Sequence, residues 1–202
     1  WGVVCEVKFS GVSYLFRGQI GNRNQKGRLY LYYRKSQGDS MKNINWKALL
    51  VSIAISLGAG AIAGALTFDS MEQYRNLYHP PLSPPGWLFP IVWSVLFILM
   101  GISSYLVYIS DDREKRAALK IYIIQLIVNV GWSIIFFNWQ AYVLAFVWLL
   151  LLWYLIYLTM RQFYQINPVS GLLLLPYLLW VTFAGYLNLA IAIHWVMVRA
   201  NL

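Results

Sequence analysis

Five apolar stretches, each about twenty residues long, constrain this chain more than any other feature. A bilayer core about 30 Å thick needs roughly 20 residues of helix at a rise of about 1.5 Å per residue. The stretches are Trp46–Phe68, Leu88–Ile109, Ala117–Phe137, Tyr142–Phe163 and Gly171–Trp195. Each is apolar around its whole circumference, which in lipid indicates a helix, because a helix satisfies its backbone groups internally. The alternating segments of about ten residues that form a transmembrane barrel are absent. The sequence therefore predicts an all-α fold, an integral membrane bundle of five transmembrane helices.

Charge divides the chain into two parts. Of its 202 residues, 60% are hydrophobic and 11% are charged, yet the formal net charge is +9. Residues 1–40 hold seven Lys or Arg against two acids, and the chain begins with Trp1, whereas Met41 stands where a natural start would precede the first span. We expect 1–40 to be a basic extension that is disordered or not native, and 41–202 to be the five-helix domain. The functional alternative is a basic arm that binds anionic lipid or RNA.

The basic residues near the span ends indicate orientation. Seven lie on the amino-terminal side: Lys42, Lys47, Arg113, Lys115, Arg116, Lys120 and Arg161. Only Arg75 and Arg199 lie on the other side. The positive-inside rule then places the amino terminus in the cytoplasm and the long loop 69–87 outside. The positive charge is thus explained by topology and contact with the lipid bilayer, and we expect no nucleic-acid partner.

Uncharged polar and aromatic side chains gather on one face of two spans. These residues are Gln125, Asn129, Trp132 and Ser133 in the third span and Trp180, Ala184 and Asn188 in the fifth. An amide in mid-membrane must find a partner, so it faces the bundle interior or a cavity. Interhelical hydrogen bonding is one interpretation. The other is an apolar ligand pocket with a few polar anchors.

Small residues recur every fourth position in the first span, at Ser56, Gly60 and Gly64. Such spacing lets two helices approach closely in lipid. Three interpretations stay open: a packing seam within the bundle, a homodimer face, or the smooth wall of a cavity.

The sequence offers no conventional catalytic constellation. The only histidines are His79 and His194, Cys5 is the single cysteine, and all acids outside the extension lie in loops. A span without a carboxylate argues against a proton-driven or sodium-driven transporter. No phosphate-binding loop, no metal-ligand spacing and no activated nucleophile is found. We therefore expect no metal and no required cofactor.

Three motifs in three spans carry a family resemblance. The first runs from Tyr78 to Leu106 and contains Pro80-Pro81, Trp87, Val92-Trp93 and Met100-Gly101; the second is Gln125…Asn129…Trp132-Ser133…Phe136-Phe137; the third is Pro176-Tyr177…Trp180…Phe183-Ala184…Asn188. Over residues 41–195 the chain resembles the tryptophan-rich sensory protein/translocator protein family, also called TspO or the peripheral-type benzodiazepine receptor. The chain resembles a bacterial member of this family, which implies the bacterial cytoplasmic membrane.

The resemblance implies a homodimeric five-helix protein with a cavity near the first loop. In the family this cavity binds tetrapyrroles such as protoporphyrin IX and haem, together with isoquinoline and benzodiazepine-type ligands. The implied ligand-binding residues are Pro81, Trp87, Phe89, Pro90, Trp93, Gln125, Asn129, Trp132, Tyr142, Trp180, Ala184 and Asn188. The tryptophan that matches Trp93 is linked to light-dependent porphyrin degradation, so Trp93 is the one implied catalytic residue. The alternative function is a transporter or a stress-sensing regulator that acts on porphyrin-like or other hydrophobic small molecules.

Two departures from the family pattern bear on ligand preference. Many relatives carry an Asp early in the fourth span, where this chain reads Leu144-Ala145-Phe146-Val147-Trp148. The sterol-recognition pattern of animal members needs a basic residue soon after a tyrosine, but Arg199 is the first to follow Tyr186. Sterol binding is therefore not predicted, and such patterns are weak in general.

Overall fold

The computed structural model describes residues 3–9, 12–18, 44–70 and 77–200 of the chain. It divides into two compact units, Trp1–Lys47 and Ala48–Leu202. In the first unit, strand β1 (Val3–Phe9) pairs antiparallel with strand β2 (Val12–Gly18), so that Val3 lies opposite Gly18. The sequence pattern did not indicate these strands. The rest of the basic extension lies outside the described residues, and its native status stays a prediction.

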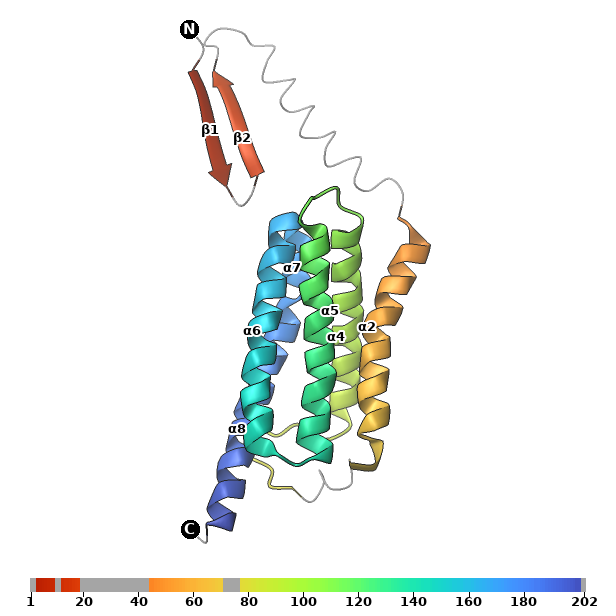
Figure 1. The fold of residues 1–202 in the computed structure, drawn as a ribbon, viewed down its shortest axis with the longest axis vertical. Helices are drawn as coiled ribbons and strands as arrows, with labels where there is room; N and C mark the ends of the chain where they lie inside the picture. Colours follow the sequence, from red (N-terminus) through yellow and green to blue (C-terminus); the bar gives the residue numbers. More distant parts are fainter. Residues whose placement is uncertain (1–2, 10–11, 19–43, 71–76, 201–202) are drawn as a thin grey trace. The chain divides into compact units, whose positions relative to one another are not determined.

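All five predicted spans are helical and side by side (Figure 1). They are α2 (Trp46–Leu66), α4 (Leu88–Tyr108), α5 (Lys115–Ser133) with the π-helical turn η2 (Ile134–Asn138), α6 (Tyr142–Ile166), and α7 (Pro168–Leu173) followed by α8 (Leu175–Arg199). A short 3-10 helix, η1 (Phe68–Ser70), follows α2. The predicted five-helix membrane bundle is therefore confirmed, and the chain is an integral membrane protein.

The fifth span differs from the sequence prediction in its start and its continuity. It begins at Pro168 instead of Gly171, and it is split at Leu174 into α7 and α8. The Asn167 side chain caps α7 by accepting hydrogen bonds from the backbone N–H groups of Val169 and Ser170. Prolines stand in the first turns of α7 and α8, where a missing N–H costs no helical hydrogen bond.

Serines and glycines hold the helices close together on the α7 side of the bundle. Ser103 Oγ donates to the Ser170 carbonyl at 2.8 Å, and Ser170 Oγ donates to the Ser103 carbonyl at 2.9 Å, which joins α4 to α7. Gly171 of α7 lies so near the backbone of Tyr164 that a Cβ at this position would collide with it. Helix α6 contacts α5, α7 and α8 and so supports the third and fifth spans.

The small residues of α2 form a packing seam over part of their length. Ser56 is buried and its Oγ lies 2.5 Å from the Tyr122 hydroxyl of α5. Gly60 lies against the Phe97 ring of α4, whereas nothing lies within 4 Å of a Cβ built on Gly64. In return, Gly101 of α4 brings its backbone against Ile53 of α2. The seam therefore packs within the bundle at its middle and opens towards the end of α2.

Candidate ligand site

The amides predicted from the third span meet a tyrosine from the fifth. Asn129 Nδ2 donates to the Tyr177 hydroxyl at 2.9 Å, and this hydroxyl donates to Gln125 Oε1 at 3.0 Å. The three side chains are at most 2% exposed. Gln125 Nε2 also contacts Met100 Sδ of α4 at 3.9 Å. Gln125 and Asn129 thus take part in interhelical hydrogen bonds, the first of the two interpretations that their sequence pattern left open.

Tyr177 was not among the predicted site residues, although it stands next to Pro176 in the third motif. The signal that could have found it is physical: a tyrosine in mid-membrane needs a partner for its hydroxyl. The spacing between the two amides and this tyrosine is 52 and 48 residues, so the sequence gives no local hint of their contact.

A second polar link joins three helices. Trp132 Nε1 of α5 donates to Asn188 Oδ1 of α8 at 3.3 Å, and Asn188 Nδ2 donates to the backbone carbonyl of Tyr142 at 2.9 Å. Tyr142 begins α6, and its ring lies edge-on to Phe136 and Trp195. The structure therefore brings Trp132, Tyr142 and Asn188 together.

An aromatic layer lies between α4 and α8. Trp93 stacks on Phe97, with ring centroids 5.6 Å apart, and meets the Tyr177 ring edge-on at 6.0 Å. One turn earlier on α4, Phe89 meets Trp180 edge-on at 5.9 Å. Trp93 and Trp180 are only partly buried, so part of each indole remains accessible. Ala184 follows Trp180 by one helical turn and adds no bulk beside it.

Trp180 carries an unsatisfied polar atom in this aromatic layer. Its Nε1 is buried and has no hydrogen-bond partner among the described residues. Buried donors in native proteins are nearly always paired, and an unpaired one calls for an explanation. A bound molecule with an acceptor oxygen would satisfy this N–H.

The residues predicted from the first loop lie further out. Pro81 is exposed, and its carbonyl accepts a hydrogen bond from the Tyr186 hydroxyl of α8 at 3.1 Å, which ties the loop to the bundle. Trp87 is 67% exposed just before α4 begins, a position that suits the aromatic belt at a membrane interface. Pro90 is exposed in the first turn of α4. Among the described residues, no hydrogen bond or ring contact joins Trp87 or Pro90 to the buried polar links described above.

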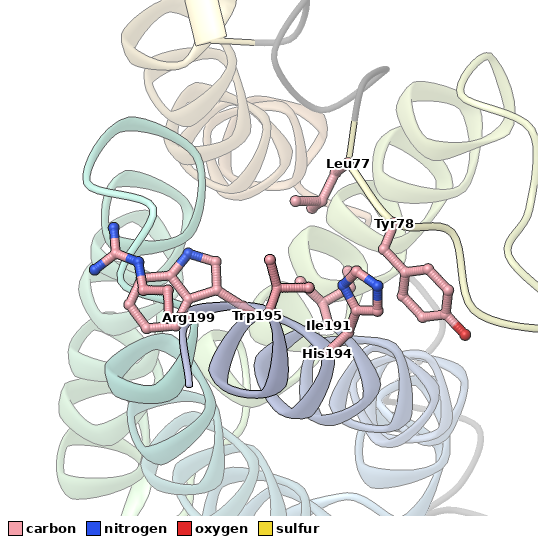
Figure 2. A pocket seen from close by; sticks show the side chains of 7 residues that line it. Leu77, Tyr78, Ile191, His194, Trp195 and Arg199 are labelled. Carbon is pink, nitrogen blue, oxygen red and sulfur yellow. The ribbon is translucent and has the colours of Figure 1, made fainter. Parts of the chain in front are cut away.

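A separate cavity of about 290 Å³ lies where Leu77 and Tyr78 of the first loop meet the end of α8 (Figure 2). Its lining residues are Leu77, Tyr78, Ile191, His194, Trp195, Val198 and Arg199. None of the predicted site residues lines it. Across residues 44–70 and 77–200, no three His, Cys, Asp or Glu side chains gather in a way that could hold a metal ion.

The fold and these contacts define a class of protein: a five-helix integral membrane protein whose interior polar groups are amides, hydroxyls and indoles without a charge. Residues 51–194 match the model of the TspO/MBR family. The chain belongs to this family.

Individual relatives support the same assignment. The tryptophan-rich protein TspO of Chlorobaculum tepidum is 39% identical over 74% of this chain and 96% of its own length. The tryptophan-rich sensory protein of Cereibacter sphaeroides is 33% identical over 76% of this chain and 95% of its own length. The translocator protein of Bos taurus is 34% identical over 69% of this chain and 82% of its own length.

Proposed function

We propose that this protein binds tetrapyrroles such as protoporphyrin IX and haem, and isoquinoline or benzodiazepine-type ligands, at the aromatic layer between α4 and α8. The observation that carries the proposal is the buried, unpartnered Nε1 of Trp180. Leaving a buried donor unpaired costs about 1–3 kcal/mol, and a ligand carboxylate or carbonyl would remove that cost. No protein cofactor is required for such binding.

The neighbouring rings favour a flat, apolar ligand. Phe89 and Trp93 are one turn apart on α4, and Tyr177 and Trp180 are one turn apart on α8, so each pair shares a face of its helix. The ring contacts between the two helices bring these faces together. Partly exposed indole faces stack well on a porphyrin plane. The amides behind them are occupied by Tyr177 and would act by fixing its ring, not by direct contact with the ligand.

Binding is tested by titrating the purified protein in detergent with protoporphyrin IX and following the quenching of tryptophan fluorescence. Trp180→Phe keeps an aromatic ring at this position and removes the N–H. We expect it to weaken affinity about tenfold, equivalent to about 1.4 kcal/mol. Trp153→Phe is the matched control, because the Trp153 N–H already donates to Thr182 at 2.8 Å and lies outside the aromatic layer. Equal affinities for wild type and Trp180→Phe would refute the role of this N–H.

Light-dependent porphyrin degradation is the reaction that Trp93 would support. Light would excite the bound porphyrin, dioxygen would be the oxidant, and the porphyrin ring would be oxidised beside Trp93, which is held by Phe97 and Tyr177. Trp93→Phe should abolish the light-dependent loss of porphyrin absorbance while largely sparing binding. Unchanged loss of absorbance in this variant would contradict the mechanism.

The second candidate function is a transporter or stress-sensing regulator of porphyrin-like or other hydrophobic molecules. Relatives bear the names translocator protein and tryptophan-rich sensory protein, which favour such roles for those proteins. The discriminating measurement is whether purified protein alone changes the porphyrin spectrum in the light. Binding without any spectral loss would favour transport or sensing over degradation.

The membrane setting follows from the basic residues. We propose that the amino terminus lies in the cytoplasm, since the loop that contains Arg113, Lys115 and Arg116 is basic. We propose the bacterial cytoplasmic membrane because the relatives from Chlorobaculum tepidum and Cereibacter sphaeroides are bacterial proteins. We also propose a homodimer, which the light-scattering mass of the detergent-solubilised protein checks.

A further inference from the structure

The cavity at the end of α8 has a chemistry that the proposed tetrapyrrole site does not use. It is formed by Leu77 and Tyr78 of the first loop and by the last part of α8, from Ile191 to Arg199 (Figure 2). Its volume of about 290 Å³ falls at the lower limit of small-molecule sites, which span about 300–1,000 Å³. It is therefore too small to enclose a whole tetrapyrrole, but it can hold a headgroup.

Arg199 supplies a positive charge in a fixed orientation. Its guanidinium carbon lies 4.0 Å from the centre of the Trp195 ring, which places the planar cation over the indole. A guanidinium held over a ring can still direct its N–H groups to another partner. A planar fork of N–H donors matches the oxygens of a phosphate. Arg199 also lies in the last turn of α8, where a cation is favoured by the helix dipole.

Two further rings form the opposite wall. Tyr78 stacks on His194 with centroids 4.1 Å apart and an angle of 6° between the planes. The stack holds the imidazole in place, and a neutral imidazole carries one N–H donor. Leu77 and Ile191 contribute apolar surface between the two walls. The cavity thus offers a cation, ring donors and an apolar floor, the combination that suits a charged headgroup attached to a hydrocarbon chain.

We propose that this cavity binds the phosphate headgroup of an anionic phospholipid, with Arg199 on the phosphate and the acyl chain along the exposed apolar side of α8. The position fits, because Trp195 and Arg199 stand at the end of a transmembrane helix, where headgroups lie. Exposed apolar residues, among them Val196 and Met197, continue from the cavity rim.

The proposal is tested with the full chain in a neutral detergent. Native mass spectrometry measures retention of short-chain phosphatidylglycerol and, in a separate arm, of phosphatidylcholine with the same chains. Wild type should prefer phosphatidylglycerol. Arg199→Gln should lower affinity for phosphatidylglycerol about tenfold, since it removes the charged donor to the phosphate. It should lower affinity for phosphatidylcholine less, because the choline cation already offsets the charge of that phosphate.

Arg161→Gln is the matched control. It removes the same charge from an exposed position near the end of α6, at the other end of the bundle (Figure 1). Phosphatidylglycerol affinity should be unchanged in this variant. An equal loss in Arg161→Gln, or equal binding of the two lipids by wild type, would overturn the proposal. Competition by inorganic phosphate as strong as that by phosphatidylglycerol would also overturn it, since the site would then recognise phosphate without the lipid. Protoporphyrin IX titration of Arg199→Gln keeps this test independent of the tetrapyrrole proposal, because that affinity should not change.

Discussion

Tyr177→Phe is the substitution whose cost the structure defines best. It keeps the ring that meets Trp93 and removes the hydroxyl that accepts from Asn129 and donates to Gln125. Two interhelical hydrogen bonds are lost, and interhelical bonds in membrane proteins contribute about 0.6 kcal/mol on average and up to about 1.7 kcal/mol. Because both amides are buried, they cannot recover a partner from water. We expect the free energy of unfolding to fall by about 1–3 kcal/mol.

The assay is reversible unfolding in mixed micelles at a fixed protein concentration, followed by far-ultraviolet circular dichroism. Tyr154→Phe is the matched control, since Tyr154 is 53% exposed on α6, and it should change the free energy of unfolding by less than about 0.5 kcal/mol.

A double-mutant cycle separates the contribution of the Tyr177 hydrogen bonds to the free energy of unfolding from that of its ring contacts. Asn129→Leu removes the amide that Tyr177→Phe leaves unpaired, so the double variant should lose about 0.6–1.7 kcal/mol less than the sum of the single losses. Additive losses, or a Tyr177→Phe cost no larger than that of Tyr154→Phe, would refute the hydrogen-bonded network as a source of stability.

The remaining predictions concern packing and orientation. Gly101→Ala should lower the free energy of unfolding by about 1–3 kcal/mol, because the new Cβ would lie 2.5 Å from Ile53 Cα. Gly64→Ala is the control: its Cβ has nothing within 4 Å, so the substitution should be neutral or slightly stabilising. Equal effects of the two substitutions in thermal unfolding would argue against the packing seam. In a Cys5→Ser background, Asp112→Cys should react with a membrane-impermeant maleimide in inside-out vesicles and not in intact cells, and labelling of intact cells would reverse the proposed orientation.

The sequence predicted the membrane spans because their physical cause is local. A run of about twenty apolar residues must be helical in lipid whatever surrounds it, so the ends of α4 and the start of α6 fell within a residue of expectation. The break at Leu174 was not predicted, because the close approach of Gly171 to Tyr164 sets the position of α7. Such an approach depends on a neighbouring helix and leaves no local signal.

The candidate site was predicted in its residue types and not in its pairings. Gln125 and Asn129 had to face the interior, because an amide in lipid needs a partner, and this follows from the sequence alone. Which partner they meet was decided by the tertiary structure, which places Tyr177 of α8 between them and Asn188 beside Trp132.

The sequence by itself thus determined that the chain spans the membrane five times and that its interior polarity carries no charge. Only the tertiary structure decided that the amides are already satisfied, that the Trp180 N–H is not, and that Arg199 lies over Trp195 beside a cavity. The physical reason is that the free energy of transferring a segment from water into lipid is the sum of contributions from its individual residues. Hydrogen bonding and ring stacking depend on the relative position of two helices, which distant parts of the chain set together.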